Sequence, residues 1–215
     1  MADGAWVLYW ASPESSAGSK VAPQVLMRIS TTGGAAEPIL EAPADTGFSF
    51  DCGRKAASTC VLSRVDKDQL VFYALDPMKG QGKELARTKI GETFWMTWAL
   101  SPDGRSVAVT GCSELRHEVR FIDLRTGEQR ELPTPSFILG GLAWSPDGQA
   151  VFGAGQQPFG DFNFNLVHLD LSGKSQILAS RLSGWFHAPV VSPDGRFLAY
   201  SQQSSEANAF LLENF

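Results

Sequence analysis

Three aspartates with near-identical neighbours are the first candidates for chemistry in this chain. The stretches SPDGRSVAVTG, SPDGQAVFGAG and SPDGRFLAYSQ contain Asp103, Asp147 and Asp194, which lie 44 and 47 residues apart. Two carboxylates a few ångströms apart can act as acid and nucleophile in glycoside hydrolysis. Several converging oxygen ligands can hold calcium. Both functions require the fold to bring acidic side chains together.

The residues around these aspartates favour a structural role. In every copy Asp-Gly lies between two apolar runs, and a proline precedes it. Glycine accepts a positive φ, aspartate bonds the local backbone, and proline stiffens the entry, so the stretch closes a tight hairpin without a ligand. Asp76, Asp123 and Asp170 likewise end apolar runs just before glycine turns. We therefore predict that all six aspartates form turns and that the chain binds no metal.

A repeat of about 46 residues organises the chain. Gly33, Gly80, Gly127 and Gly173 end four similar apolar runs, at spacings of 47, 47 and 46 residues. One full unit, 95–132, has the pattern of four short strands separated by turns, with no helical periodicity. Short strands at this spacing predict an all-β protein, and a four-stranded antiparallel unit of about 45 residues is typical of a β-propeller blade.

We predict a single β-propeller over residues 1–215 with about five blade units. The units span about 2–43, 47–88, 95–134, 138–180 and 184–215. The terminal blades are expected to be incomplete, because Asp3-Gly4 stands where later units have SPDG and the last unit stops before a fourth strand. The hypothesis is that the chain is the C-terminal part of a larger propeller, whose open blade edges allow self-association.

Composition argues against several functional classes. The chain is 43% hydrophobic and 19% charged, with a net charge of −5. Without a basic stripe, binding to nucleic acid lacks its electrostatic driving force. No apolar run approaches the roughly 18–20 residues of a membrane helix, and the three cysteines and three histidines match no zinc motif. We expect no cofactor, no nucleic-acid partner and no membrane contact by this segment.

The predicted innermost strands are poor in catalytic groups. Across 47–52, 95–100, 138–144 and 185–191 the only acid is Asp51, which disfavours a glycosidase pair. The G-x-S-x-G elbow of serine hydrolases is absent, so we predict that the chain is not an enzyme. Asp51 and His187, on predicted inner strands, are candidates for contacting a ligand at the channel mouth.

Two loops contain the remaining candidates. The stretch GQQPFGDFNFN (155–165) is aromatic and rich in glycine, and Phe159, Phe162 and Phe164 could form a partner-binding surface or fold back onto their blade. In the second unit a loop of seven residues separates Cys52 from Cys60. These two cysteines could form one local disulfide or remain a free pair.

The SPDG repeat, with W-x-x-SPDG at 98–104, followed by an apolar run and a turn such as D-L-x-x-G at 123–127, resembles the TolB-type, WD-repeat-like propeller modules of bacteria. The stretches FDCGRKAASTCVLSR, FYALDPMKGQGKELAR and SPDGRFLAYSQQSSEANAFLLENF are further similar to the C-terminal propellers of Acidobacteria-type membrane-bound kinase or winged-helix regulatory proteins. The resemblance covers nearly the whole chain. The chain has neither a kinase HRD or DFG loop nor a helix-turn-helix segment, so those activities are not transferred to its residues.

The resemblance implies a non-catalytic binding module, namely the sensory or protein-interaction domain of a bacterial membrane-anchored regulator. It implies an extracytoplasmic location, and it favours a disulfide between Cys52 and Cys60 because such bridges persist in oxidising compartments. The partner would be a protein or a small molecule. The alternative is an accessory propeller of a peptidase or hydrolase whose catalytic domain lies elsewhere in the parent protein.

Overall fold

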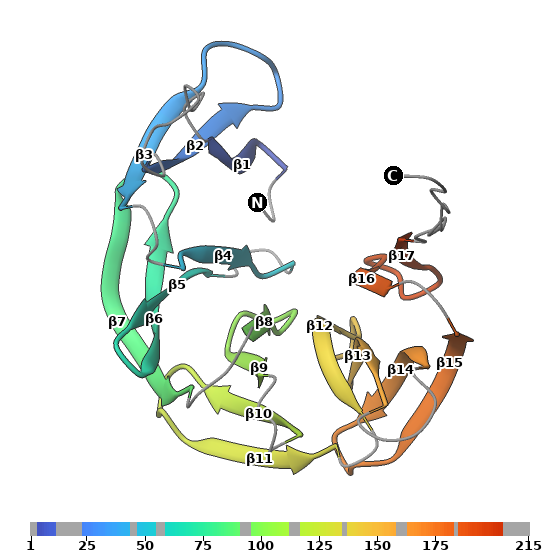
Figure 1. The fold of residues 1–215 in the computed structure, drawn as a ribbon. Coiled ribbons are helices and arrows are strands. Elements are labelled where there is room, and N and C mark those ends of the chain that lie inside the picture. Colours follow the sequence, from blue (N-terminus) through green and yellow to red (C-terminus); the bar gives the residue numbers. More distant parts are fainter. Residues whose placement is uncertain are drawn as a thin grey trace, which may run out of the picture.

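The described part of the molecule is built entirely from short β-strands. The computed structural model describes residues 4–11, 23–43, 47–54, 59–90, 96–111, 117–134, 137–157, 163–182 and 185–203. Within these ranges the strands form five separate antiparallel sheets, which lie side by side around a common axis (Figure 1). The prediction of an all-β propeller with about five units is therefore confirmed.

Each sheet is one blade, and its strands follow the sequence order from one edge to the other. Blade 1 contains β1 (Trp6–Ala11), β2 (Gln24–Ser30) and β3 (Glu37–Ala42). Blade 2 contains β4 (Ser49–Cys52), β5 (Cys60–Asp66), β6 (Gln69–Asp76) and β7 (Gly80–Lys89). Blade 3 contains β8 (Met96–Leu100), β9 (Ser106–Gly111), β10 (Glu118–Asp123) and β11 (Gln129–Pro133). Blade 4 contains β12 (Ile138–Trp144), β13 (Ala150–Gln156), β14 (Phe164–Asp170) and β15 (Ser175–Arg181). Blade 5 contains β16 (Trp185–Val191) and β17 (Leu198–Gln203). In blades 2 to 5 the first strand lies nearest the axis (Figure 1).

The terminal blades have fewer strands than the central ones, as the repeat predicts. Blade 1 has three strands and blade 5 has two within the described residues. Gly4, just before β1, has a φ of 66°, close to the 74° of Gly104 in an SPDG turn. This match supports the alignment of Asp3-Gly4 with the SPDG turns. The end of the last predicted unit, 204–215, lies outside the described residues. The described strands form an arc that is open between blades 1 and 5 (Figure 1).

The hydrophobic core lies between the blades. Each of four buried clusters joins side chains from two neighbouring blades. The rings of Phe72 in blade 2 and Trp98 in blade 3 meet edge to face at 5.3 Å, as do those of Phe121 in blade 3 and Trp144 in blade 4. Strands packed on both faces are apolar at successive positions rather than at alternate ones. This packing fixes each blade, and the turns at its ends, relative to the next.

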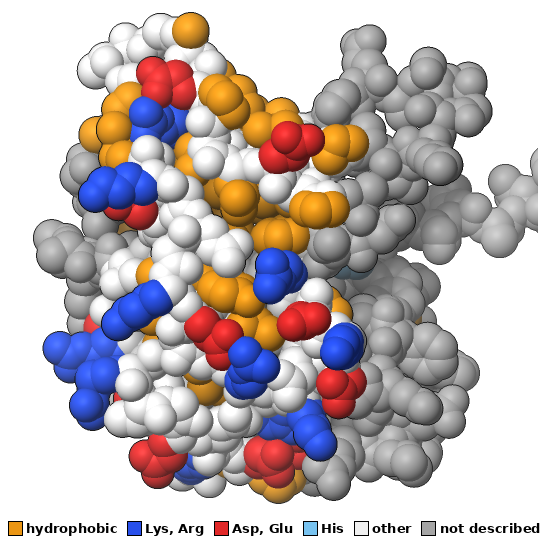
Figure 2. All heavy atoms as spheres, turned by 90° about the vertical axis from the view of Figure 1, so that its left-hand side faces the viewer, with side chains coloured by type: hydrophobic (Ala, Val, Ile, Leu, Met, Phe, Trp, Pro, Cys, Tyr) orange, Lys and Arg blue, Asp and Glu red, His pale blue; other side chains and the backbone are white. Residues whose placement is uncertain are grey.

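The outer side of the propeller presents a mixed surface. Over β3 and β7, basic and acidic side chains are interspersed with apolar and uncharged ones, without a field of one sign (Figure 2). Among the described residues, no helix has the length and apolarity that a membrane crossing requires.

Candidate functional site

The aspartates of the three SPDG copies hold their hairpin turns. Asp103 Oδ1 accepts hydrogen bonds from the Ser101 hydroxyl at 2.7 Å and from the Arg105 amide at 3.1 Å. The corresponding groups make the same two bonds to Asp147 and Asp194. Each turn is thus closed by its own side chains, which supports the structural interpretation of the repeated motif.

The aspartates at the ends of the third strands act in the same way. Asp123 Oδ1 accepts hydrogen bonds from the backbone amides of Arg125 and Thr126, and Asp76 and Asp170 also bond the amides that follow them. These bonds lower the pKa of Asp123, with the Thr126 amide as the largest cause. Within the described residues, no group of three His, Cys, Asp or Glu side chains is arranged to hold a metal ion.

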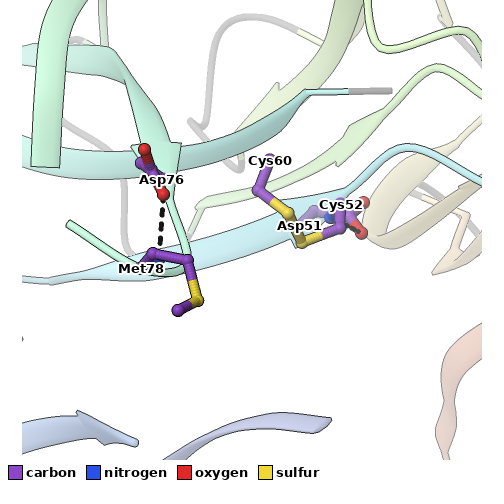
Figure 3. The surroundings of a disulfide bond; sticks show 5 residues. All are labelled: Asp51, Cys52, Cys60, Asp76 and Met78. Atoms are coloured by element: carbon purple, nitrogen blue, oxygen red, sulfur yellow. Dashed lines mark hydrogen bonds between the residues drawn. A yellow bond between two sulfur atoms is a disulfide. The ribbon is translucent and has the colours of Figure 1, made fainter. Parts of the chain in front are cut away.

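Near the axis, the loop after β4 ties blade 2 to blades 3 and 5. Cys52 and Cys60 face each other in the β4–β5 register and form a disulfide with an S–S distance of 2.01 Å (Figure 3). Just inside the bridged loop, the Arg54 amide donates to the Pro102 carbonyl of blade 3 at 3.2 Å. The Arg54 guanidinium also donates to the Val191 carbonyl of blade 5. A single residue therefore connects three blades.

Asp51 belongs to the same set of connections. Its Oδ1 accepts from the Cys52 amide at 2.8 Å, and its Oδ2 accepts from the Leu100 amide of blade 3 at 3.0 Å. Burial raises the pKa of Asp51, while these two backbone hydrogen bonds act in the opposite direction. The structure thus places Asp51 in a link between blades. Its contact with a ligand stays a prediction.

Of the other predicted site residues, the structure describes Phe164 and His187. Phe159 and Phe162 lie outside the described residues. Phe164 is half-buried and packs against the cluster between blades 4 and 5 that includes Phe186. His187 is exposed near the start of β16, whereas Asp51 lies near the end of β4. Because the inner strands of successive blades run in the same direction, His187 and Asp51 lie toward opposite faces of the propeller.

A groove of about 270 Å³ opens on the face that carries the SPDG turns, between blades 3 and 4. Phe121 and the end of β12 at Trp144 line its apolar part, and the turns that contain Asp103 and Asp147 line its charged part. At another point of the lining, the guanidinium of Arg130 in blade 3 donates to the backbone carbonyl of Leu171 in blade 4.

The SPDG turns that border this groove leave more space than those at the next junction. At the junction of blades 4 and 5, a Cβ added to Gly195 would lie 3.4 Å from Pro146. At the junction of blades 3 and 4, a Cβ added to the equivalent Gly148 would meet nothing within 4 Å. The two turns therefore stand apart at this junction.

Sequence reasoning missed the groove, although one signal for it was present. Trp144 directly precedes its SPDG copy, where the other two copies have Leu100 and Val191. The Trp144 indole Nε1 donates to the Ala99 carbonyl of blade 3 at 3.0 Å, so this large ring bridges the junction beneath the turns. The large aromatic residue before one SPDG copy, where the other two copies have aliphatic residues, could have indicated the groove.

Comparison with known proteins identifies the architecture. No family model matches the chain. The uncharacterized protein Atu1656 of Agrobacterium fabrum is 26% identical over 156 residues, covering 70% of this chain and 52% of that protein. TolB from Acinetobacter baumannii matches with a TM-score of 0.66 at 19% identity, over 86% of this chain and 44% of that one. A TolB candidate from Agrobacterium tumefaciens matches with a TM-score of 0.63 at 17% identity, over 93% and 72% of the two chains.

The chain folds as a TolB-like propeller. At these identities the likeness establishes the fold alone, and the chain spans about half the length of the curated relative that it matches. The finer resemblance, to the propellers of membrane-bound kinase or winged-helix regulators, stays a prediction.

Proposed function

We propose that this propeller is a non-catalytic binding module, the sensory or protein-interaction domain of a bacterial membrane-anchored regulator. The observation that carries the proposal is the groove between blades 3 and 4. It is a hollow with an apolar floor and charged walls, held open between two packed blades. Binding sites in proteins are typically concave, largely preformed and lined by apolar side chains with a few polar groups.

The state of the acidic side chains supports a role without catalysis. A general base or nucleophile must have its partner within hydrogen-bond reach. Asp103, Asp147 and Asp194 instead accept bonds within their own turns, and Asp51 accepts bonds from two backbone amides. The TolB-like neighbours belong to a fold that serves as a scaffold for many binding functions.

Two observations support an extracytoplasmic location. The Cys52–Cys60 disulfide would persist in an oxidising compartment and is uncommon in the bacterial cytosol. The second observation is the likeness to TolB-type propellers, because the resemblance of this sequence to bacterial propellers of that type implies an extracytoplasmic location.

Photo-crosslinking in cells tests the proposal. A benzoylphenylalanine would replace Gln149, which lines the groove, or Gln176, which is exposed on the outermost strand of the same blade. Both variants are made in the full-length parent protein in its own bacterium. A discrete adduct from position 149 and none from position 176 supports a binding face at the groove. No adduct from position 149, or the same adducts from both positions, would contradict the proposal.

A further inference from the structure

The groove between blades 3 and 4 has an apolar floor. Phe121 and Trp144 come from adjacent blades, and their rings meet edge to face at 5.3 Å. Trp144 is 7% exposed and Phe121 is half-buried, so the floor offers the edges of two rings that packing holds in place. A slender aliphatic chain could lie along the edges of these two rings, in a hollow of about 270 Å³.

The charges on the groove walls favour a basic occupant. Two carboxylates, Asp103 and Asp147, come from two different turns, and the cation in the lining, Arg130, donates to the Leu171 carbonyl. The hydrogen bond from the Ser145 hydroxyl lowers the pKa of Asp147, which therefore stays ionised well below neutral pH. The two turns place two negative charges beside an apolar floor, against one positive charge.

The room for an occupant depends on the separation of the two turns. A Cβ added to Gly195 would lie 3.4 Å from Pro146 at the next junction, whereas one added to Gly148 would meet nothing within 4 Å, although the turns have the same sequence and the same internal hydrogen bonds. The open junction is thus a property of this pair of blades and not of the SPDG motif.

We propose that the groove receives a basic side chain, that of arginine or lysine, from an extended segment of a partner polypeptide. The aliphatic stem would lie on Phe121 and Trp144, and the cationic head would pair with Asp103 and Asp147. Long basic side chains bury an apolar stem while their charged head pairs at the rim, and ion pairs of guanidinium and carboxylate are among the stronger hydrogen-bonded contacts. This inference rests on the proposed binding function and names the chemistry of the partner.

The binding test uses matched peptides and matched variants of the chain. The probes are N-acetyl-Gly-Arg-Gly amide and the same peptide with citrulline, which keeps the shape and loses the charge. Binding is followed by ¹⁵N NMR at the Gln149 amide and at the Trp144 indole, which is assigned by Trp144→Phe. The arginine peptide should shift both signals, and the citrulline peptide should bind at least about fivefold more weakly.

Asparagine substitutions separate the charge from the turn. Asp103→Asn with Asp147→Asn keeps the Oδ1 acceptor that each turn uses but removes both charges, so binding of the arginine peptide should fall at least about fivefold. Asp194→Asn makes the same change in the third turn, away from the groove, and should leave binding unchanged. Dispersed NMR spectra establish that each variant is folded, and the single Asp147→Asn change replaces the double variant if that does not fold.

Three results would overturn the inference. The first two are equal binding of both peptides and unchanged binding of the arginine peptide by the folded double variant. The third is the absence of a shift at either signal at 10 mM peptide, a concentration about tenfold above a millimolar Kd. These outcomes are distinct from failure of the proposed function. A crosslink at position 149 that survives the Asp103→Asn and Asp147→Asn changes would sink the basic-side-chain proposal and leave the binding module standing. Absence of any crosslink there contradicts the binding module itself.

Discussion

Opening the Cys52–Cys60 disulfide should lower the stability of the propeller by a measurable amount. The two cysteines are separated by 8 positions in the sequence, so the bridge closes a short loop. For a loop of this size, the chain-entropy model gives a loss of about 2.6 kcal/mol at 25 °C when the bridge is opened. That value is a large part of the net stability of a typical domain, about 5–15 kcal/mol.

The structure gives a reason to expect no less than this value. Asp51 and Arg54 link blade 2 to blades 3 and 5, and both lie within two positions of Cys52 in the chain. Without the bridge the hairpin is held only by non-covalent contacts, among them these bonds and the bond from the Gly53 amide to the Thr59 carbonyl, and each hydrogen bond typically contributes about 0.5–1.5 kcal/mol. Opening the bridge therefore weakens the contacts of Arg54 with blades 3 and 5 as well as the hairpin itself.

Urea unfolding at pH 7, followed by tryptophan fluorescence, measures the effect. The protein carries Cys112→Ser, so that only the bridging pair can form a disulfide, and it is compared with and without dithiothreitol. Counting of free thiols before each titration establishes the redox state. A Cys52→Ala/Cys60→Ala variant, which has no bridge in either condition, controls for effects of the reductant. If the fully reduced protein unfolds at the same urea concentration as the oxidised one, the reasoning from loop entropy and blade links is refuted.

Further predictions concern the strands, the turns and pH. Gly155→Ala should cost about 1–3 kcal/mol in thermal melts, because a Cβ there would lie 2.0 Å from the Ile138 carbonyl oxygen. Gly127→Ala is its control: a Cβ there meets nothing within 4 Å, and only its φ of 75° should cost about 1 kcal/mol. Asp194→Ala should lower the melting temperature at neutral pH. Because its hydrogen bonds lower the pKa of Asp194, this difference should shrink as the pH falls from the ordinary value of 3.8 through the lowered pKa. The pH dependence of stability that Asp51 contributes should have the opposite sign. Because its pKa is raised, its titration should reduce stability as the pH rises above 3.8, and Asp51→Asn should flatten that slope in urea titrations.

The sequence predicted those parts of the fold that depend on local interactions. The SPDG turns, the aspartates that end the third strands and the incomplete first blade all follow from residues close together in the chain. The bounds of β12 and β16 match the expected strands residue for residue. A glycine that accepts positive φ beside an aspartate that bonds its own backbone specifies a turn without reference to the rest of the molecule.

The candidate site could not be predicted in this way, because it depends on contacts between blades. Arg54 meets the carbonyl of Val191, 137 positions further along the chain. The groove lies between turns of two different blades, above the junction that the Trp144 indole bridges. For Phe164 the sequence left open a partner-binding surface or packing onto its own blade, and the structure shows it half-buried in the packing between blades 4 and 5. An apolar residue in a loop-rich stretch carries no signal that tells a binding surface from an interface between blades.

The three SPDG turns separate what a repeat determines from what a junction determines. Asp103, Asp147 and Asp194 make the same hydrogen bonds, so the motif gives each blade the same turn and the same carboxylate. Two of these carboxylates line the groove, while Asp194 and its turn are not part of the lining. Any function of these acids must therefore come from the spacing between neighbouring blades. Binding specificity in such a propeller can change through substitutions at the blade junctions, such as Trp144, while the turns and the fold stay intact.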